Sequence, residues 1–122
     1  MHAAHDPDIW PTAFEVAADK RSLAVTFDNL EHFDLSAEYL RVSSPSAEVQ
    51  GHSAAERKTV PGKQNVAIRD VQMVGNYAVR IVFDDGHDSG LFTWPYLADL
   101  GREQSTLWAI YIKELREKSL TR

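Results

Sequence analysis

The chain has 122 residues, of which 43% are hydrophobic and 25% are charged, and this composition predicts one ordinary globular domain. Its 13 basic and 18 acidic residues give a net charge of −5, which disfavours binding to nucleic acid or to an anionic membrane surface. Because the chain contains no cysteine, it cannot use disulfides, thiolate catalysis, cysteine-ligated zinc or a self-held iron–sulfur cluster.

The start of the chain and its hydropathy indicate where the protein resides. The opening stretch MHAAHDPDIWPTAF has acids and prolines where a signal peptide has a basic region followed by an apolar one. No apolar run approaches the roughly 20 residues that span a bilayer. We therefore expect a cytoplasmic protein that does not associate with membranes.

The first third of the chain predicts an arm, three strands and a short helix. Residues 1–13 are expected to form a flexible N-terminal arm, because two prolines and a DPD run offer little apolar surface to bury. Alternating apolar residues then predict a hairpin with strands at Phe14–Val16 and Leu23–Phe27, followed by a short strand at Phe33–Leu35. Ser36 is placed to act as the N-cap of a short helix.

A long polar stretch separates this part from a second group of strands. Residues 43–65 show no apolar period and are expected to form a loop, and long loops in compact domains are often functional. Strand character resumes over Val66–Met73 and continues over Tyr77–Phe83, with a turn at Gly75–Asn76 between them. The Asp85–Gly86 pair predicts a two-residue type I′ hairpin turn.

The last third predicts a short returning strand and two helices. Thr93 is expected to cap a helix that ends just before Gly101. Residues 102–122 are expected to form a C-terminal helix on the same domain, and either its apolar stripe packs on the sheet or Trp108 and its neighbours form a partner or dimer surface. The predicted fold class is α+β: mainly antiparallel β-sheet with short helices and a C-terminal helix.

The motifs of common catalytic sites are absent from the sequence. It has no GxGxxG or GK[ST] loop for phosphates and no GxSxG nucleophile elbow, so we do not expect an enzyme. Imidazole and carboxylate side chains can bind zinc or iron. His52 and His87 are the pair of interest, because a long loop can reach a hairpin tip.

Two segments resemble a known family. LRVSSPSAEVQGH (Leu40–His52) and DDGHDSGLFTWPYLADLG (Asp84–Gly101) resemble the N-terminal domain of gamma-butyrobetaine hydroxylase and its small stand-alone bacterial relatives, over roughly residues 14–101. The resemblance implies an accessory module that, in the hydroxylase, holds zinc through three cysteines and one histidine. It places the cysteine positions at Ser44, Ser46 and Val49 and the histidine at His87, so one ligand of the four is present.

Three roles for His87 are compatible with this pattern. Its ring can hydrogen-bond the facing loop near Ser44–Ser46 in place of a metal link. It can belong to a remodelled metal site with His52, Asp85 or Glu48. It can also be an exposed residue at a hairpin tip.

The resemblance favours a non-catalytic accessory or binding domain. Related domains fused to iron–sulfur carrier ATPases suggest a role near metal-centre or iron–sulfur handling. The alternatives are a metal-binding protein that uses zinc or iron, and a small enzyme of unknown reaction. Under the favoured hypothesis we expect no cofactor. We expect the partner to be a protein, which the sequence does not identify, and the chain to be a monomer or a weak homodimer. The candidate partner surface consists of Ser44, Ser46, Glu48, Trp94 and Trp108, although Trp94 also suits a core position.

Overall fold

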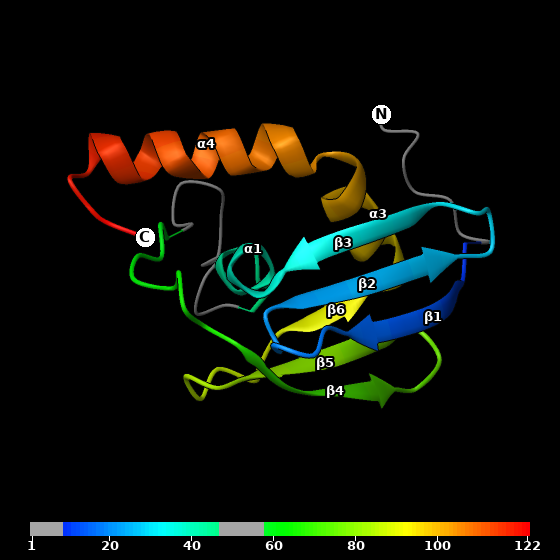
Figure 1. Ribbon diagram of the computed structural model, residues 1–122. Helices are drawn as coiled ribbons and strands as arrows, with labels where there is room; N and C mark the ends of the chain where they lie inside the picture. The colour runs from blue at the N-terminus through cyan, green and yellow to red at the C-terminus, as the bar shows by residue number, and fades with distance from the viewer. Residues whose placement is uncertain (1–8, 47–57) are drawn as a thin grey trace.

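The structure is a computed structural model that describes residues 9–46 and 58–122. Two three-stranded antiparallel sheets, with strand orders β1-β2-β3 and β4-β5-β6, are combined with helices (Figure 1). This arrangement confirms the predicted α+β class. The elements in chain order are β1 (Pro11–Val16), β2 (Ser22–Phe27), β3 (His32–Ser36), α1 (Ala37–Val42), β4 (Ile68–Val74), β5 (Ala78–Phe83), β6 (Leu91–Thr93), α3 (Trp94–Arg102) and α4 (Gln104–Glu117).

The first sheet is organised around its central strand, β2. Leu23, Val25 and Phe27 are at most 1% exposed and alternate with half-buried residues, as expected for a strand with one face on the core. Antiparallel pairing aligns Val25 with Phe14 of β1 and with Phe33 of β3. The predicted three-strand pattern at this end of the chain is therefore confirmed.

The second sheet is organised around β5 in the same way. Val79, Ile81 and Phe83 are fully buried and lie on one face of the strand, as the alternating pattern predicts. Gly75 has a φ of 54°, a left-handed conformation that costs glycine little, and it lies in the turn between β4 and β5. The predicted turn at this position is confirmed.

Both sheets share one hydrophobic core with α1 and α3. Phe27 from the first sheet, Phe83 from the second, and Leu97 and Leu100 of α3 belong to one buried cluster. Figure 1 shows α4 on the β3 side of the molecule, with α1 beneath it at one end of the strands. The helices therefore meet at one side of the molecule.

Both predicted helix caps are present. The Ser36 hydroxyl accepts a hydrogen bond from the Tyr39 amide at 3.0 Å, and the Thr93 hydroxyl accepts one from the Tyr96 amide at 3.3 Å. The predicted end of α3 before Gly101 is wrong, because the helix continues to Arg102. A Cβ at position 101 would lie 2.3 Å from the Phe33 ring, so close packing on β3 accounts for the glycine better than helix termination does.

The predicted two-residue turn at Asp85–Gly86 is also wrong. Gly86 has a φ of 92°, but Asp85 is not among the described residues with positive φ, and a type I′ turn needs both. The amide of Gly86 donates to the Phe83 carbonyl at 3.2 Å, and the amide of Phe83 donates to the His87 carbonyl at 3.0 Å. Residues 84–90 therefore form a wider excursion that turns the His87 side chain back toward the domain.

The ends of the described chain modify the predicted boundaries. Ile9 is 3% exposed and belongs to the core, and β1 begins at Pro11, so residues 9–13 are part of the domain and not of the predicted arm. Residues 1–8 lie outside the described residues. Tyr111 and Leu115 of α4 pack against Val42 of helix α1, whereas the stripe was predicted to pack on the sheet. Within residues 9–46 and 58–122, none of the helices combines the length and apolar character needed to cross a bilayer.

Candidate functional site

His87 joins the loop after α1 to the excursion between β5 and β6. Its Nε2 atom hydrogen-bonds the Ser44 hydroxyl at 2.9 Å and the Ser46 hydroxyl at 3.4 Å. The predicted hydrogen bond between this ring and the loop is confirmed. Because His87 is only 6% exposed, the alternative of an exposed tip residue is wrong.

A charged cluster supports the same junction. Asp85 accepts hydrogen bonds from Arg41 at 2.9 Å, from Lys63 at 2.6 Å and from the backbone amide of His87 at 3.1 Å. Burial alone would raise the pKa of Asp85, but the hydrogen bonds from Lys63, the His87 amide and Arg41 outweigh it and lower the pKa to about 2. The carboxylate therefore stays ionised at neutral pH and ties α1 and the residue-63 segment to the β5–β6 excursion.

The side chains around His87 that could act as metal ligands do not fit the zinc site that the resemblance implies. Within the described residues, Nε2 hydrogen-bonds the hydroxyls of two serines, whereas zinc prefers thiolate, imidazole and carboxylate ligands. Asp85 is engaged by two cations. No group of three or more histidine, aspartate or glutamate side chains in the described part of the chain is arranged to hold a metal. His52 and Glu48, the other predicted ligands, lie outside the described residues.

The predicted partner surface is mostly interior. Ser44 is fully buried, Ser46 is 8% exposed and Trp94 is 5% exposed, so these side chains cannot form an open docking face. The serines are covered because they bind His87 and because the Ser44 hydroxyl lies directly over Gly90. Trp94 instead packs on Phe14, with ring centroids 5.9 Å apart.

Trp108 is half-buried on α4 and is partly covered. Its ring lies 6.3 Å from that of Tyr39 and 5.3 Å from that of Tyr111. The guanidinium of Arg122 lies over the same indole at 5.4 Å and also hydrogen-bonds the buried carboxylate of Glu38. Trp108 thus serves mainly to fix α4 on α1, and the partner role predicted for it stays a prediction.

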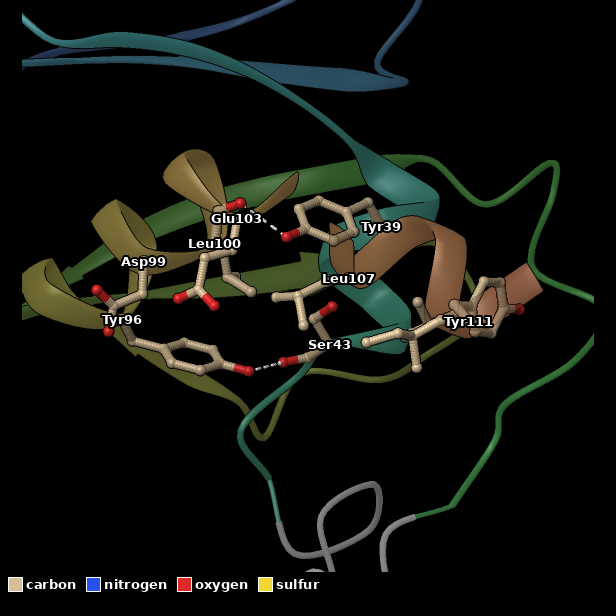
Figure 2. A pocket seen from close by; sticks show the side chains of 10 residues that line it. Tyr39, Ser43, Tyr96, Asp99, Leu100, Glu103, Leu107 and Tyr111 are labelled. Atoms are coloured by element: carbon tan, nitrogen blue, oxygen red, sulfur yellow. Dashed lines mark hydrogen bonds between the residues drawn. The ribbon is translucent and has the colours of Figure 1, made fainter. Parts of the chain in front are cut away.

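The feature that sequence reasoning missed is a groove between α1, α3 and α4, shown in Figure 2. Its volume is about 380 Å³, within the range of ligand pockets. Leu107 and Ile110 of α4 supply an apolar wall, and Ile110 is 43% exposed. Figure 2 shows Tyr96 and Asp99 of α3 at one end of the groove and Tyr111 of α4 at the other.

Three tyrosines line this groove, and each has its hydroxyl bound to a backbone carbonyl. Tyr39 donates to Leu100 at 2.7 Å, and Tyr96 donates to Ser43 at 2.5 Å (Figure 2). Tyr111 donates to the Val60 carbonyl at 2.6 Å. The groove therefore has rigid walls, since each ring is anchored to a second segment of the chain.

Two carboxylates, those of Asp99 and Glu103, line the same groove. Burial raises the pKa of the Tyr39 hydroxyl, and the nearby Tyr96 and Glu103 raise it further. Burial likewise raises the pKa of Tyr111, to about 12. Tyr39 and Tyr111 therefore stay neutral at physiological pH, and the negative charge of the groove comes from its acids.

A second hollow, of about 410 Å³, lies between β1 and the β4–β5 turn. Trp10, Phe14, Met73 and Trp94 line it, and none of its lining residues is charged. Its polar side chains include those of Thr12 and Asn76, but without a charged group it offers less chemistry than the groove beside α4.

The comparisons with known proteins place the fold and the site in a family. The sequence pattern described as "Gamma-butyrobetaine hydroxylase-like, N-terminal" matches residues 14–98. The chain belongs to this family. The match includes the His87 junction and the Tyr39 and Tyr96 walls of the groove, whereas α4 lies beyond it. No curated protein matches the chain.

Solved structures of similar chains agree with this assignment to the gamma-butyrobetaine hydroxylase-like N-terminal family. Two NMR solution structures share 43% and 46% identity, with TM-scores of 0.81 and 0.80. Each alignment covers 93% of this chain, and covers 89% and 84% of the respective relatives. A crystal structure of a protein of unknown function from the DUF971 family of Acidithiobacillus ferrooxidans shares 34% identity, with a TM-score of 0.62, over 75% of this chain and 91% of that one.

The sequence contains signals for some of the residues that line the groove, but it does not show that these residues lie side by side. Tyr111 belongs to the apolar stripe of the C-terminal helix, and Asp99 and Glu103 are four residues apart, a spacing that aligns side chains on a helix. Nothing local indicates that Tyr39, about sixty positions earlier in the chain, lies beside them. The groove depends on how α1 packs against α3 and α4, which is a tertiary property.

Proposed function

We propose that this protein is a non-catalytic binding domain that docks a protein partner in the groove between α1, α3 and α4. The observation that carries the proposal is the combination of rigid tyrosine walls with an exposed apolar residue, Ile110, at the surface of the groove. Pre-organised aromatic walls lose little conformational entropy on binding, which favours their use in recognition.

The arrangement at His87 supports a structural role over a catalytic one. A serine–histidine pair can act as nucleophile and base only if substrate reaches the serine oxygen. Ser44 is fully buried, and its hydroxyl bonds both the His87 ring and the Ser46 amide. We therefore assign the pair to holding the loop after α1 in place. Since that loop begins at Ser43, the same hydrogen bonds support one wall of the groove.

Co-purification of the full chain with and without a changed groove tests the proposal. We expect Ile110→Lys to reduce recovery of a specific partner at least tenfold, because the new charge would enter the apolar wall. Ala109→Lys is the matched control, since Ala109 is exposed on the same helix and does not line the groove. The proposal would be contradicted if both variants recovered the partner equally well. It would also be contradicted if the unaltered chain recovered no specific partner.

A further inference from the structure

We infer that the groove between α1, α3 and α4 recognises a lysine or arginine side chain on an amphipathic segment of its partner. This inference rests on the proposed binding function and names the chemistry of the ligand. It follows from three properties of the groove: its tyrosine and carboxylate oxygens are hydrogen-bond acceptors, Glu103 gives it negative charge, and Leu107 and Ile110 give it an apolar wall.

The acceptor character follows from the tyrosine hydrogen bonds. A phenolic hydroxyl has one proton, and Tyr39, Tyr96 and Tyr111 each donate that proton to a backbone carbonyl. The hydroxyl oxygens can therefore only accept further hydrogen bonds. The carboxylates of Asp99 and Glu103 are also acceptors when ionised. A ligand that complements these groups must donate hydrogen bonds.

The charge of the groove is negative, and Glu103 is its most available acid. Other described carboxylates in this part of the molecule are paired: Glu31 with Arg102, and Glu38 with Arg122. Within residues 9–46 and 58–122, no basic side chain lies within ion-pair distance of Glu103. Its side chain also makes no capping hydrogen bond to α4, although it stands at the N-cap position. This carboxylate can therefore pair with a cation brought by a partner.

The apolar wall indicates which type of side chain bears the cation. Leu107 and Ile110 can pack against a hydrocarbon chain while the charged end reaches the acids. Lysine and arginine combine an aliphatic stem with a cation that only donates hydrogen bonds. The faces of the tyrosine rings offer a further attraction to such a cation. An anionic ligand would be repelled by Glu103, and a purely apolar ligand would leave the Glu103 carboxylate without a cation to pair with.

NMR titration of the ¹⁵N-labelled full chain with three small probes tests the inference. Hexylammonium has the stem and the cation, 1-hexanol has the stem alone, and hexanoate reverses the charge. We expect hexylammonium to shift amides of α3 and of the start of α4. It should bind about two- to fivefold more tightly than hexanol, the equivalent of one partly exposed ion pair. Hexanoate should bind most weakly.

Glu103→Gln provides the discriminating variant, and Glu117→Gln is its control. Glu117 is exposed at the end of α4 and does not line the groove, so both variants remove the same charge from the chain. We expect Glu103→Gln alone to reduce hexylammonium binding to the level of hexanol without changing hexanol binding. If hexanol and hexylammonium bind the groove equally in the unaltered protein, the charge inference is overturned while the binding proposal stands. If no probe shifts groove amides, both are overturned.

Discussion

The hydroxyl of Tyr96 donates a hydrogen bond to the carbonyl of Ser43 at 2.5 Å, one residue before the serine that binds His87. This contact joins α3 to the end of α1. It makes the wall of the groove and the His87 junction parts of one connected structure, although Tyr96 and Ser43 are 53 positions apart in the chain. A change at either end of this connection should therefore be detected at the other.

Removal of the Tyr96 hydroxyl tests that connection. We expect Tyr96→Phe to lower the free energy of unfolding by about 1 kcal/mol, because the Ser43 carbonyl loses a partly buried hydrogen bond. It should also shift the NMR signals of the His87 ring. Tyr77→Phe is the control, since Tyr77 is 50% exposed in the β4–β5 turn. Unchanged His87 signals in Tyr96→Phe would show that the two features are independent.

Gly90 should be coupled energetically to Ser44. A Cβ on Gly90 would lie 2.3 Å from the Ser44 hydroxyl oxygen, so Gly90→Ala forces that hydroxyl away from the His87 ring. We expect a loss of about 1–3 kcal/mol, the usual cost of overpacking. Ser44→Ala should cost about as much, because it leaves a buried ring nitrogen without this partner.

Urea unfolding of both single variants and the double variant measures this coupling. Because Ser44→Ala removes the atom that collides, we expect Gly90→Ala to cost at least about 1 kcal/mol less in the Ser44→Ala background. Strictly additive losses would mean that the contact between these two residues is not what requires glycine at position 90.

Gly101 should resist a change that normally stabilises helices. Alanine is favoured over glycine inside a helix by about 1 kcal/mol. A Cβ here would meet ring atoms of Phe33 at 2.3–2.7 Å, and overpacking of this kind costs about 1–3 kcal/mol. We therefore expect Gly101→Ala to destabilise the protein in thermal melts. In the background of Phe33→Ala the same change should be neutral or stabilising, and destabilisation there would contradict the packing explanation.

The contribution of Asp85 should depend on pH in a defined direction. Its pKa falls from a reference value of 3.8 to about 2 in the folded protein, so the folded state favours the ionised carboxylate. The resulting stabilisation is present above about pH 4 and is lost as the pH falls toward 2. We expect Asp85→Asn to lower stability at pH 7 by roughly 1 kcal/mol, allowing for solvent screening of a partly exposed group.

Denaturant unfolding between pH 7 and pH 2 checks this prediction. The difference between the unaltered protein and Asp85→Asn should shrink as the pH falls below about 4. Asp88→Asn, a change of the same type at an exposed position of the same excursion, should give no such convergence. A constant difference across the whole range would argue against a stabilising role of the Asp85 carboxylate charge.

Local patterns predicted the features that depend on local physics. The alternation of Leu23, Val25 and Phe27 identified a half-buried strand, and Ser36 and Thr93 identified the starts of two helices. The resemblance to the family supplied a non-local contact, the hydrogen bonds from His87 to the loop, because aligned ligand positions must lie close together in space.

Features that depend on tertiary contacts were missed or misread. Gly101 looked like a helix stop because its contact with Phe33 is invisible in the sequence. Ser44 looked like part of an exposed polar loop, although Gly90 leaves room for it to be buried. The groove was missed because α1 is far from α3 and α4 in the chain, and only the packing of α1 against them brings Tyr39 close to Glu103.

Site-specific photocrosslinking in cells tests the proposed binding surface most directly. A photoreactive phenylalanine analogue at Ile110, in the groove, is compared with the same analogue at Met73, which is 61% exposed beside the other hollow. The account predicts a discrete crosslinked partner from position 110, lost when Glu103 is changed to arginine, and little product from position 73. Crosslinking at position 73 alone, or at position 110 without any effect of Glu103→Arg, would contradict it.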